Sequence, residues 1–336
     1  MDFDELVKDS IVADMLFPCC SMHELWQNNL NLFYEALDGY AKAGVNFVSI
    51  TVGLDHHSDI SFQLREIGRY RNALLNQPDK YRIATNASDI RNAKSEGRLA
   101  VGLHFQGTNM LQGDLNLVEV YHQLGITHML MAYNERNMVG DGCHEPANAG
   151  LSSFGHRLVA KMNEIGMIVD LTHTGERTAL DATAASTRPV IYSHSSCRAL
   201  FDHERNITDE QIQTCATTDG VVCVNGVGIF LSDCGTDVSA KTICRHIDHI
   251  VQLVGPRHVG IGLDYVANTD GLVQIVQTNK GRFADDSYDK PTFAFAGPEV
   301  IPHIAEELLS LNYTEEDIRT ILGGNIMRVF DEIHTG

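Results

Sequence analysis

Two histidines stand near the ends of short apolar runs, where each run turns polar. His173 ends the segment MIVDLTH (167–173), and His194 lies in PVIYSHS (189–195). Neutral imidazoles are good ligands for Zn²⁺ and similar divalent ions, and a catalytic ion keeps one position open for water. Because such an ion lowers the pKa of its water toward about 7, it suits hydrolysis at neutral pH. His173 and His194 are therefore the first candidates for metal ligands.

A carboxylate ends another run of the same kind. Asp264 closes HVGIGLD (258–264). A carboxylate close to a metal-activated water can take its proton and return it, so we expect Asp264 to be the general base or a further ligand. Each residue also has a plainer interpretation. Asp264 is compatible with an ordinary helix or turn cap, and a single histidine at a strand end is more often a surface residue than a ligand.

Eight short apolar runs predict the strands that position these residues. They are IVADML (11–16), NFVSITV (46–52), LAVGLHFQ (99–106), HMLMAYN (128–134), MIVDLTH (167–173), PVIYSHS (189–195), VVCVNGVG (221–228) and HVGIGLD (258–264). Nearly continuous apolar runs are typical of parallel strands buried on both faces. Segments with helical spacing separate them, clearest at 28–44, 154–166 and 242–255.

Eight repeats of strand and helix predict an α/β fold of the (β/α)₈ TIM-barrel type. The alternative is an open, doubly wound sheet, but no GxGxxG or Walker loop follows any strand. Active sites of barrels lie at the C-terminal ends of the strands, which is where His173, His194 and Asp264 fall. His128 starts its run and is expected at the opposite face. His104 lies two residues before Gln106 and therefore faces the same side of its strand. It is either a substitute metal ligand or a residue of the packed core.

Composition and charge limit the class of protein. Lys and Arg total 25 against 44 Asp and Glu, a net charge of −19, which disfavours nucleic acid and membrane surfaces as partners. No run approaches the roughly 18 apolar residues of a membrane span, and no signal peptide is visible. The eight cysteines form no CxxC pair. We expect a cytoplasmic protein, compatible with a homo-oligomer, with one domain over 1–336, a long loop near 265–297 and closing C-terminal helices.

Two polar segments after strands are candidates for substrate contacts. YNERNMVGDGCHE (133–145) is punctuated by glycine and begins with Tyr133 and Asn134, as a substrate loop does. Arg205, in HERNITDEQI, could hold a substrate carboxylate through two parallel hydrogen bonds. Its alternative is a solvent-facing loop arginine.

At these residues the chain resembles the renal or membrane dipeptidase family (metallopeptidase family M19, an amidohydrolase-like barrel). The resemblance runs from about residue 99 to the C-terminus. It is carried by GLSSFGHRLVAKMNEIGMIVDLTHTGERT, RPVIYSHSSCRALFDHERNITDE, VGIGLD and ILGGNIMRVF. It implies a (β/α)₈ barrel, a zinc site and hydrolysis of dipeptides with a free N-terminus and a free C-terminal carboxylate. By the same resemblance His173 and His194 are the histidine ligands of one zinc, Arg205 grips the substrate carboxylate, and Asp264 assists the attacking water.

The chain departs from the family at one metal position. Leu16 and Pro18 stand where the family's first strand supplies a histidine and an aspartate to the other zinc. Gln106 aligns with the glutamate that bridges both ions, and Tyr133 with a substrate-contacting histidine. An amide oxygen is a neutral, weaker donor than a carboxylate. The sequence therefore predicts a branch with an altered first metal site and one zinc ion rather than two.

Three hypotheses remain open. In the first, a single metal on His173 and His194, helped by Gln106 and Asp264, hydrolyses dipeptides or similar small amides. In the second, the chain is a non-hydrolytic relative that retains the pocket and Arg205 and binds a small carboxylated ligand; in either case we expect Asn134 to contact the bound molecule. In the third, it is a metal-independent lyase or isomerase that uses Asp264 and Tyr133 as acid and base.

Overall fold

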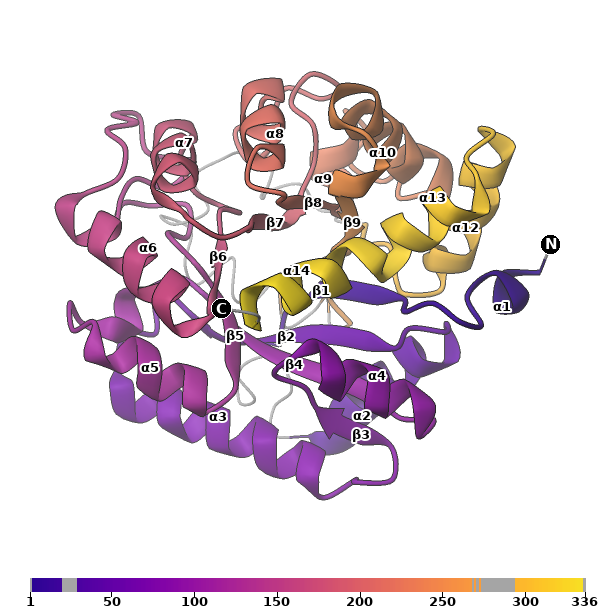
Figure 1. Ribbon diagram of the computed structural model, residues 1–336, viewed down its shortest axis with the longest axis horizontal. Coiled ribbons are helices and arrows are strands. Elements are labelled where there is room, and N and C mark those ends of the chain that lie inside the picture. The colour runs from indigo at the N-terminus through magenta and orange to yellow at the C-terminus, as the bar shows by residue number, and fades with distance from the viewer. Residues whose placement is uncertain (1, 20–28, 268, 270–271, 273–293, 335–336) are drawn as a thin grey trace.

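The computed structural model describes residues 2–19, 29–267, 269, 272 and 294–334. In this part of the chain, parallel strands and helices alternate to form a nearly closed barrel (Figure 1). The strands, in their order around the barrel, are β1 (Ala13–Phe17), β2 (Phe47–Leu54), β4 (Leu99–Gln106), β5 (Ile126–Leu130), β6 (Ile168–Asp170), β7 (Val190–Ser195), β8 (Val221–Val224) and β9 (Val259–Ile261). The predicted (β/α)₈ fold is confirmed, and the open-sheet alternative is wrong.

One strand escaped prediction. β3 (Tyr81–Ile83) pairs with the first residues of β4, from Leu99 to Val101, and β5 pairs with β4 further along, from Leu103 to Phe105. β3 therefore extends the sheet at the N-terminal end of the barrel and does not contribute to the opposite end. Its three residues are too few to show a period in the sequence.

Hydrogen bonds between β1 and the segment after β9 close the barrel. The Asp14 carboxylate accepts a hydrogen bond from the backbone N–H of Leu263 at 3.0 Å, and from that of Leu16 at 3.0 Å. The backbone N–H of Asp264 donates to the carbonyl of Leu16 at 3.1 Å. A buried carboxylate thus pairs with backbone donors at the seam, and Asp264 is held directly beside β1.

Helices surround the strands and leave one end of the barrel for a site. They are α1 (Phe3–Leu6), α2 (Leu30–Lys42), α3 (Ile60–Leu75), α4 (Ala87–Ser95), α5 (Asn116–Gln123), α6 (Ser153–Ile165), α7 (Glu176–Ala185), α8 (Asp209–Ala216), α9 (Gly228–Leu231), α10 (Ala240–Val254), α12 (Val300–Ser310), α13 (Glu315–Arg319) and α14 (Asn325–His334). Ile243, Ile247 and Ile250 of α10 recur at helical spacing and are all buried. Helical periodicity therefore marks the face that packs on the barrel.

The last helix covers the N-terminal end of the strands. Ile326 and Phe330 of α14 belong to a buried cluster with Ala13, Phe47 and Ala100, which open three strands. The rings of Phe330 and Phe47 meet edge to face, with centroids 5.4 Å apart. In Figure 1, α14 crosses the middle of the strand ring in yellow. Because this end is sealed by apolar side chains, chemistry belongs at the other end.

Thr314 and Asp317 form a reciprocal capping box at the first turn of α13. The predicted long loop near 265–297 lies mostly outside the described residues. Among the helices that are described, none combines the length and the apolar character required to cross a membrane.

Candidate active site

Three candidate residues lie just beyond strand ends in an unusual backbone conformation. Asn134, His173 and Asp264 have φ values of +60°, +64° and +57°. Residues other than glycine rarely adopt this left-handed conformation, and such strain is often found at functional sites. The strands stop earlier than the apolar runs, so these turns carry the side chains away from the strand direction. Sequence periodicity gives no sign of this turn.

Asp170 holds the turn that presents His173. It ends β6, is fully buried, and accepts hydrogen bonds from the backbone N–H groups of Thr172 at 3.0 Å and Ser193 at 3.1 Å. Ser193 lies on β7 directly before His194. One carboxylate therefore ties the loop of the first histidine to the strand of the second, and it explains the aspartate inside the VDLTH segment.

The two histidines face each other through the same ring nitrogen. Nε2 of His173 lies 3.0 Å from Nε2 of His194. Nδ1 of His173 contacts the side-chain oxygen of Asn134 at 2.6 Å, and Nδ1 of His194 contacts the hydroxyl of Ser193 at 2.8 Å. The thiol of Cys143 also donates to the Asn134 oxygen, at 3.4 Å. Since an oxygen there can only accept, the Nδ1 of His173 holds the proton and its Nε2 keeps a lone pair.

Both rings are neutral at ordinary pH. Burial lowers the pKa of His173 and of His194 well below the usual value, and the positive charge of Arg205 lowers them further. A neutral imidazole with its other nitrogen fixed by a hydrogen bond is the form that ligates metals.

The donor set fits one divalent ion. Two ligands about 2.0–2.1 Å from a common ion lie roughly 3–3.4 Å apart when they subtend 90–109° there, which matches the two Nε2 atoms. Within the described residues, no three His, Cys, Asp or Glu side chains gather as a ligand group. Gln106 offers a neutral oxygen: its amide nitrogen donates to the Thr51 hydroxyl at 2.8 Å, so Oε1 is the atom that would ligate an ion. Among the described residues, no hydrogen bond joins Gln106 to His173 or His194. We find no donors for a second ion at Leu16, which is apolar and fully buried.

The two deeper histidines pack inside the barrel. His104 contacts the hydroxyls of Ser49 and Thr51 through its two ring nitrogens, both at 2.8 Å, so both nitrogens are already engaged. Its ring stacks on that of His128 with centroids 4.3 Å apart. The expectation that His128 lies at the opposite face was wrong, because β5 starts two residues earlier, at Ile126, and His128 is fully buried mid-strand. Of the two interpretations of His104, the structure favours core packing.

Arg205 is buried beside the histidine pair. Its side chain donates to the carbonyl of His194 at 2.8 Å and lies over the ring of Phe230, 5.6 Å from the centroid. Only 2% of the residue is exposed, so the solvent-facing alternative is wrong. Its Nε and Nη1 have no hydrogen-bond partner, and no carboxylate of the described residues forms an ion pair with it. A buried guanidinium with two unused donors is suited to a carboxylate from a ligand.

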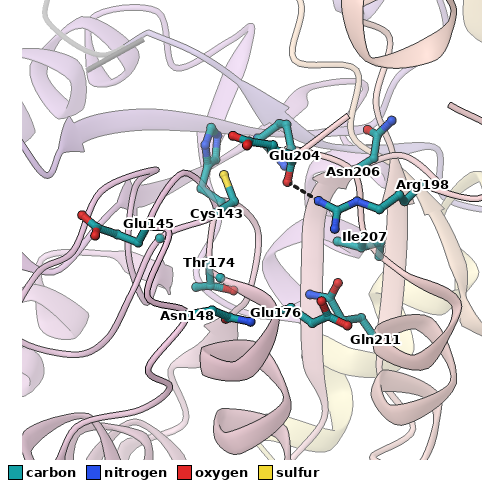
Figure 2. Close-up of a pocket in the computed structure, with 14 residues that line it drawn as sticks. Cys143, Glu145, Asn148, Thr174, Glu176, Arg198, Glu204, Asn206, Ile207 and Gln211 are labelled. Carbon is teal, nitrogen blue, oxygen red and sulfur yellow. Dashed lines mark hydrogen bonds between the residues drawn. The ribbon is translucent and has the colours of Figure 1, made fainter. Parts of the chain in front are cut away.

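A cavity of about 200 Å³ opens next to these groups. His173 and Arg205 both line it, together with residues of the 133–145 loop and of α7 and α8. Figure 2 shows Cys143 and Thr174 on one side of the cavity and Arg198 and Gln211 on the other. The cavity therefore borders His173 and the buried guanidinium, and His194 does not line it.

The two candidate acid–base residues lie on different sides of the histidine pair. Tyr133 stacks on the His173 ring at 4.1 Å, with 25° between the planes. Asp264 lies at the β1–β9 seam. Burial raises the pKa of Asp264 to about 7, the positive charge of Arg205 opposes the rise, and the negative charge of Asp14 adds to it. Tyr133, Asn134, His173, His194 and Arg205 thus form one contact set, and Asp264 is coupled to it through the charge of Arg205.

Sequence reasoning missed the residues that hold the site. Asp170, Thr51 and Ser193 each fix the loop or a neighbouring side chain rather than facing a ligand. Their only signal was position: each lies on a strand near a candidate residue. Hydroxyl groups inside strands are common, so the signal could not single them out.

Comparisons with known proteins give a consistent result. A family model described as membrane dipeptidase (peptidase family M19) matches residues 22–280. The chain is 29% identical to "Dipeptidase aclJ" of Aspergillus oryzae over 261 residues, 76% of this chain and 57% of that protein. It also spans only 61% of a dipeptidase of Claviceps purpurea. The chain thus covers about three fifths of these relatives.

Solved structures share the fold over nearly the whole chain. An amidohydrolase from Pseudomonas aeruginosa superposes with a TM-score of 0.88 and 27% identity, covering 99% of each chain. A metallo peptidase from Rhodobacter sphaeroides, solved with a phosphinate mimic of the dipeptide L-Ala-D-Ala, has a TM-score of 0.77 and 19% identity, covering 96% of this chain and 99% of its own.

Proposed function

The chain belongs to the membrane dipeptidase family, peptidase family M19, and on that premise we propose that it is a metal-dependent hydrolase of dipeptides or similar small amides. The observation that carries the proposal is the 3.0 Å approach of the Nε2 atoms of His173 and His194, both buried and neutral. When the Ser193 hydroxyl accepts from Nδ1 of His194, the Nε2 lone pairs of both rings meet at one point, and a cation bound there relieves their repulsion.

We propose that His173, His194 and Oε1 of Gln106 hold one divalent ion, and zinc is the ion that we expect. Such an ion supplies Lewis acidity for water and for the amide carbonyl. One ion is sufficient for this chemistry in other hydrolases. The lack of donors at Leu16 therefore changes the expected substrate range rather than the reaction.

The chain's own residues have separate tasks in this proposal. Arg205 binds the C-terminal carboxylate of the substrate through Nε and Nη1, which have no protein partner. Asn134 keeps the proton of His173 on Nδ1 and contacts the substrate with its amide nitrogen. Asp264, with a pKa of about 7, takes the proton of the attacking water and passes it to the leaving amine. Tyr133 packs on the His173 ring and borders the substrate at the same time.

Metal analysis combined with a dipeptide panel tests the proposal. The protein is purified in zinc-containing buffer, its metal content is measured, and hydrolysis of dipeptides with L- or D-residues at the second position is followed. About one ion per chain together with turnover supports the hydrolase. A metal-replete protein without turnover on any dipeptide or small amide contradicts it.

A second candidate is a pocket protein that binds a small carboxylated ligand without hydrolysis. It is favoured by one observation: among the described residues, no three His, Cys, Asp or Glu side chains form a ligand group. In that case the purified protein contains no metal, and calorimetry detects binding of dipeptides to the metal-free chain. Binding then depends on Arg205 and is unaffected by replacement of His194.

A further inference from the structure

A second buried amide at the barrel mouth has an unused donor. Asn225 follows β8 directly and is fully buried. Its side-chain oxygen accepts a hydrogen bond from the backbone N–H of Val227 at 3.1 Å, and its Nδ2 has no partner. Because a backbone N–H can only donate, the oxygen and nitrogen of this amide cannot be exchanged. The free end of Asn225 is therefore a hydrogen-bond donor.

Strand register places Asn225 between the strand of His194, a proposed metal ligand, and the strand that leads to Asp264, the proposed base. Val224, the residue before it, pairs with Ser195 of β7 on one side and with Ile261 of β9 on the other. Asn225 thus ends the strand between that of His194 and that of Asp264. The chain then enters α9, where Phe230 packs under the guanidinium of Arg205. Arg205 donates to the carbonyl of His194, the residue before Ser195, so the guanidinium and Asn225 lie at the ends of neighbouring strands.

The energetics of these groups point to a ligand. A buried donor without a partner costs about 1–3 kcal/mol, and native proteins contain few of them. The buried side-chain atoms of the described residues that lack a partner include three donors on two residues near the mouth, namely Nδ2 of Asn225 and Nε and Nη1 of Arg205. An ionised carboxylate offers about four acceptor positions and no donor. It can therefore satisfy all three donors, whereas a primary amide has one acceptor oxygen and brings donors of its own.

We propose that Nδ2 of Asn225 is the third donor of a carboxylate subsite, beside Nε and Nη1 of Arg205. The inference rests on the proposed function, which supplies a dipeptide-like substrate with a free C-terminal carboxylate. It adds a substrate-binding residue and a physical reason for the free C-terminal carboxylate that the family resemblance implies: a carboxylate pairs with every donor, and the corresponding amide does not.

Replacement of Asn225 by aspartate tests the subsite with little change in shape. In Asn225→Asp, one oxygen still accepts from Val227, and the donor becomes a negative charge. The probes are glycyl-D-alanine and its C-terminal amide. For glycyl-D-alanine, we expect KM to rise about 10- to 100-fold with kcat little changed, because a hydrogen bond to a charged group is worth about 1.5–3 kcal/mol. For the amide, KM changes less than about threefold.

A matched variant controls for the added charge. Asn163 of α6 also accepts a backbone N–H, that of Thr187, but it lies near the start of β7, at the other end of the barrel. Asn163→Asp should leave both KM values unchanged. Equal loss of kcat for both probes in Asn225→Asp would mean that this amide acts at the reacting carbonyl, and it would overturn the proposal. So would unchanged KM for glycyl-D-alanine.

Calorimetry separates this inference from the proposed hydrolase activity. If the parent protein binds glycyl-D-alanine without cleaving it, the dissociation constants replace KM in the same comparison. A preference for the carboxylate that disappears in Asn225→Asp then supports the subsite while the hydrolase proposal fails. Equal affinity of parent and variant contradicts the subsite, whether or not the parent hydrolyses dipeptides.

Discussion

Buried polar side chains differ in their hydrogen bonding between the two sides of the barrel interior. On the β2–β4 side, the polar side chains Ser49, Thr51, His104 and Gln106 bond to one another in a continuous series. On the β5–β8 side, the amide nitrogens of Asn134 and Asn225 and two nitrogens of Arg205 have no partner. Both sides are buried, so the contrast is one of hydrogen bonding and not of exposure.

This contrast distinguishes His104 from the pair His173 and His194. His104 has hydroxyl partners at both nitrogens, so its polar atoms need nothing from a ligand. His173 and His194 each have one nitrogen satisfied and present the other to the same point. Since buried polar groups without partners are costly, they persist where a ligand or ion completes them. Hydrogen bonding therefore sets His104 apart from the pair, whereas His128, whose Nδ1 contacts Thr127 and whose Nε2 has no hydrogen-bond partner, is set apart by its position in mid-strand.

The largest effect is expected from removing a histidine on the β5–β8 side. His194→Ala deletes one of two imidazole ligands, so we expect loss of bound metal and a fall in kcat/KM of at least about 10³-fold. Metal content and dipeptide hydrolysis measure both effects.

The matching variant on the β2–β4 side is His104→Ala. It should keep the metal and lose stability, by about 2–5 kcal/mol, because it leaves a cavity and two unpaired hydroxyls. Urea unfolding measures the loss. If His104→Ala releases the metal and His194→Ala retains it, the assignment of the two sides is reversed.

A smaller effect is expected at the guanidinium. Arg205→Lys keeps the positive charge but replaces a planar set of donors by a single ammonium group, so parallel hydrogen bonds to a carboxylate are lost. We expect kcat/KM for dipeptides to fall about 10- to 100-fold, mostly through KM, with metal content unchanged. Kinetics on dipeptides and on their C-terminal amides measure the effect. An equal loss on both substrate types would show that Arg205 does not contact the carboxylate.

The sequence predicts the fold better than it predicts this contrast. Apolar runs separated by helical segments define the barrel, and strand-end position singles out His173 and His194. The sequence cannot show that His173 has a left-handed backbone conformation or that His104 lies between two hydroxyls. Both features depend on neighbours distant in the sequence. The start of β5 was placed two residues late, at His128 instead of Ile126, and His128 was misassigned with it.

Thr51 supports Gln106, the proposed third ligand, and gives a prediction of intermediate size. It accepts the amide of Gln106 and contacts His104, so Thr51→Val frees the Gln106 amide to rotate. Loss of such a supporting contact typically lowers metal affinity by about 10-fold or more, and we expect the lower end because Gln106 is a neutral ligand. Competition with a chelator measures the affinity. Ser49→Ala removes the other partner of His104 and should leave metal affinity unchanged; an equal loss in both variants would exclude a specific role for Gln106.

The smallest predicted effect concerns pH. Asp264 has a pKa of about 7, raised by burial and by the charge of Asp14, and a base acts only when ionised. The rate should therefore rise with pH up to about 7. Asp14→Asn removes a nearby negative charge, so the acid limb of kcat/KM should shift to lower pH by less than about one unit. A pH–rate profile tests this, and a shift to higher pH would contradict the coupling.

Stability gives an independent check on the same pair. Burial also raises the pKa of Asp14 from 3.8 to about 7, so the folded chain binds this proton more tightly than the unfolded chain does. The stability from this group is fully present below pH 3.8 and is lost as pH rises through 7, by at most about 1.4 kcal/mol per pH unit. Asparagine can still accept from Leu16 and Leu263 but does not ionise. Asp14→Asn should therefore be more stable than the parent in urea at pH 8, and this advantage should vanish at pH 4. If the stability advantage of Asp14→Asn instead grows as the pH falls, Asp14 is ionised in the folded barrel. The seam between β1 and β9 would then require a cation, as we propose for the histidine pair.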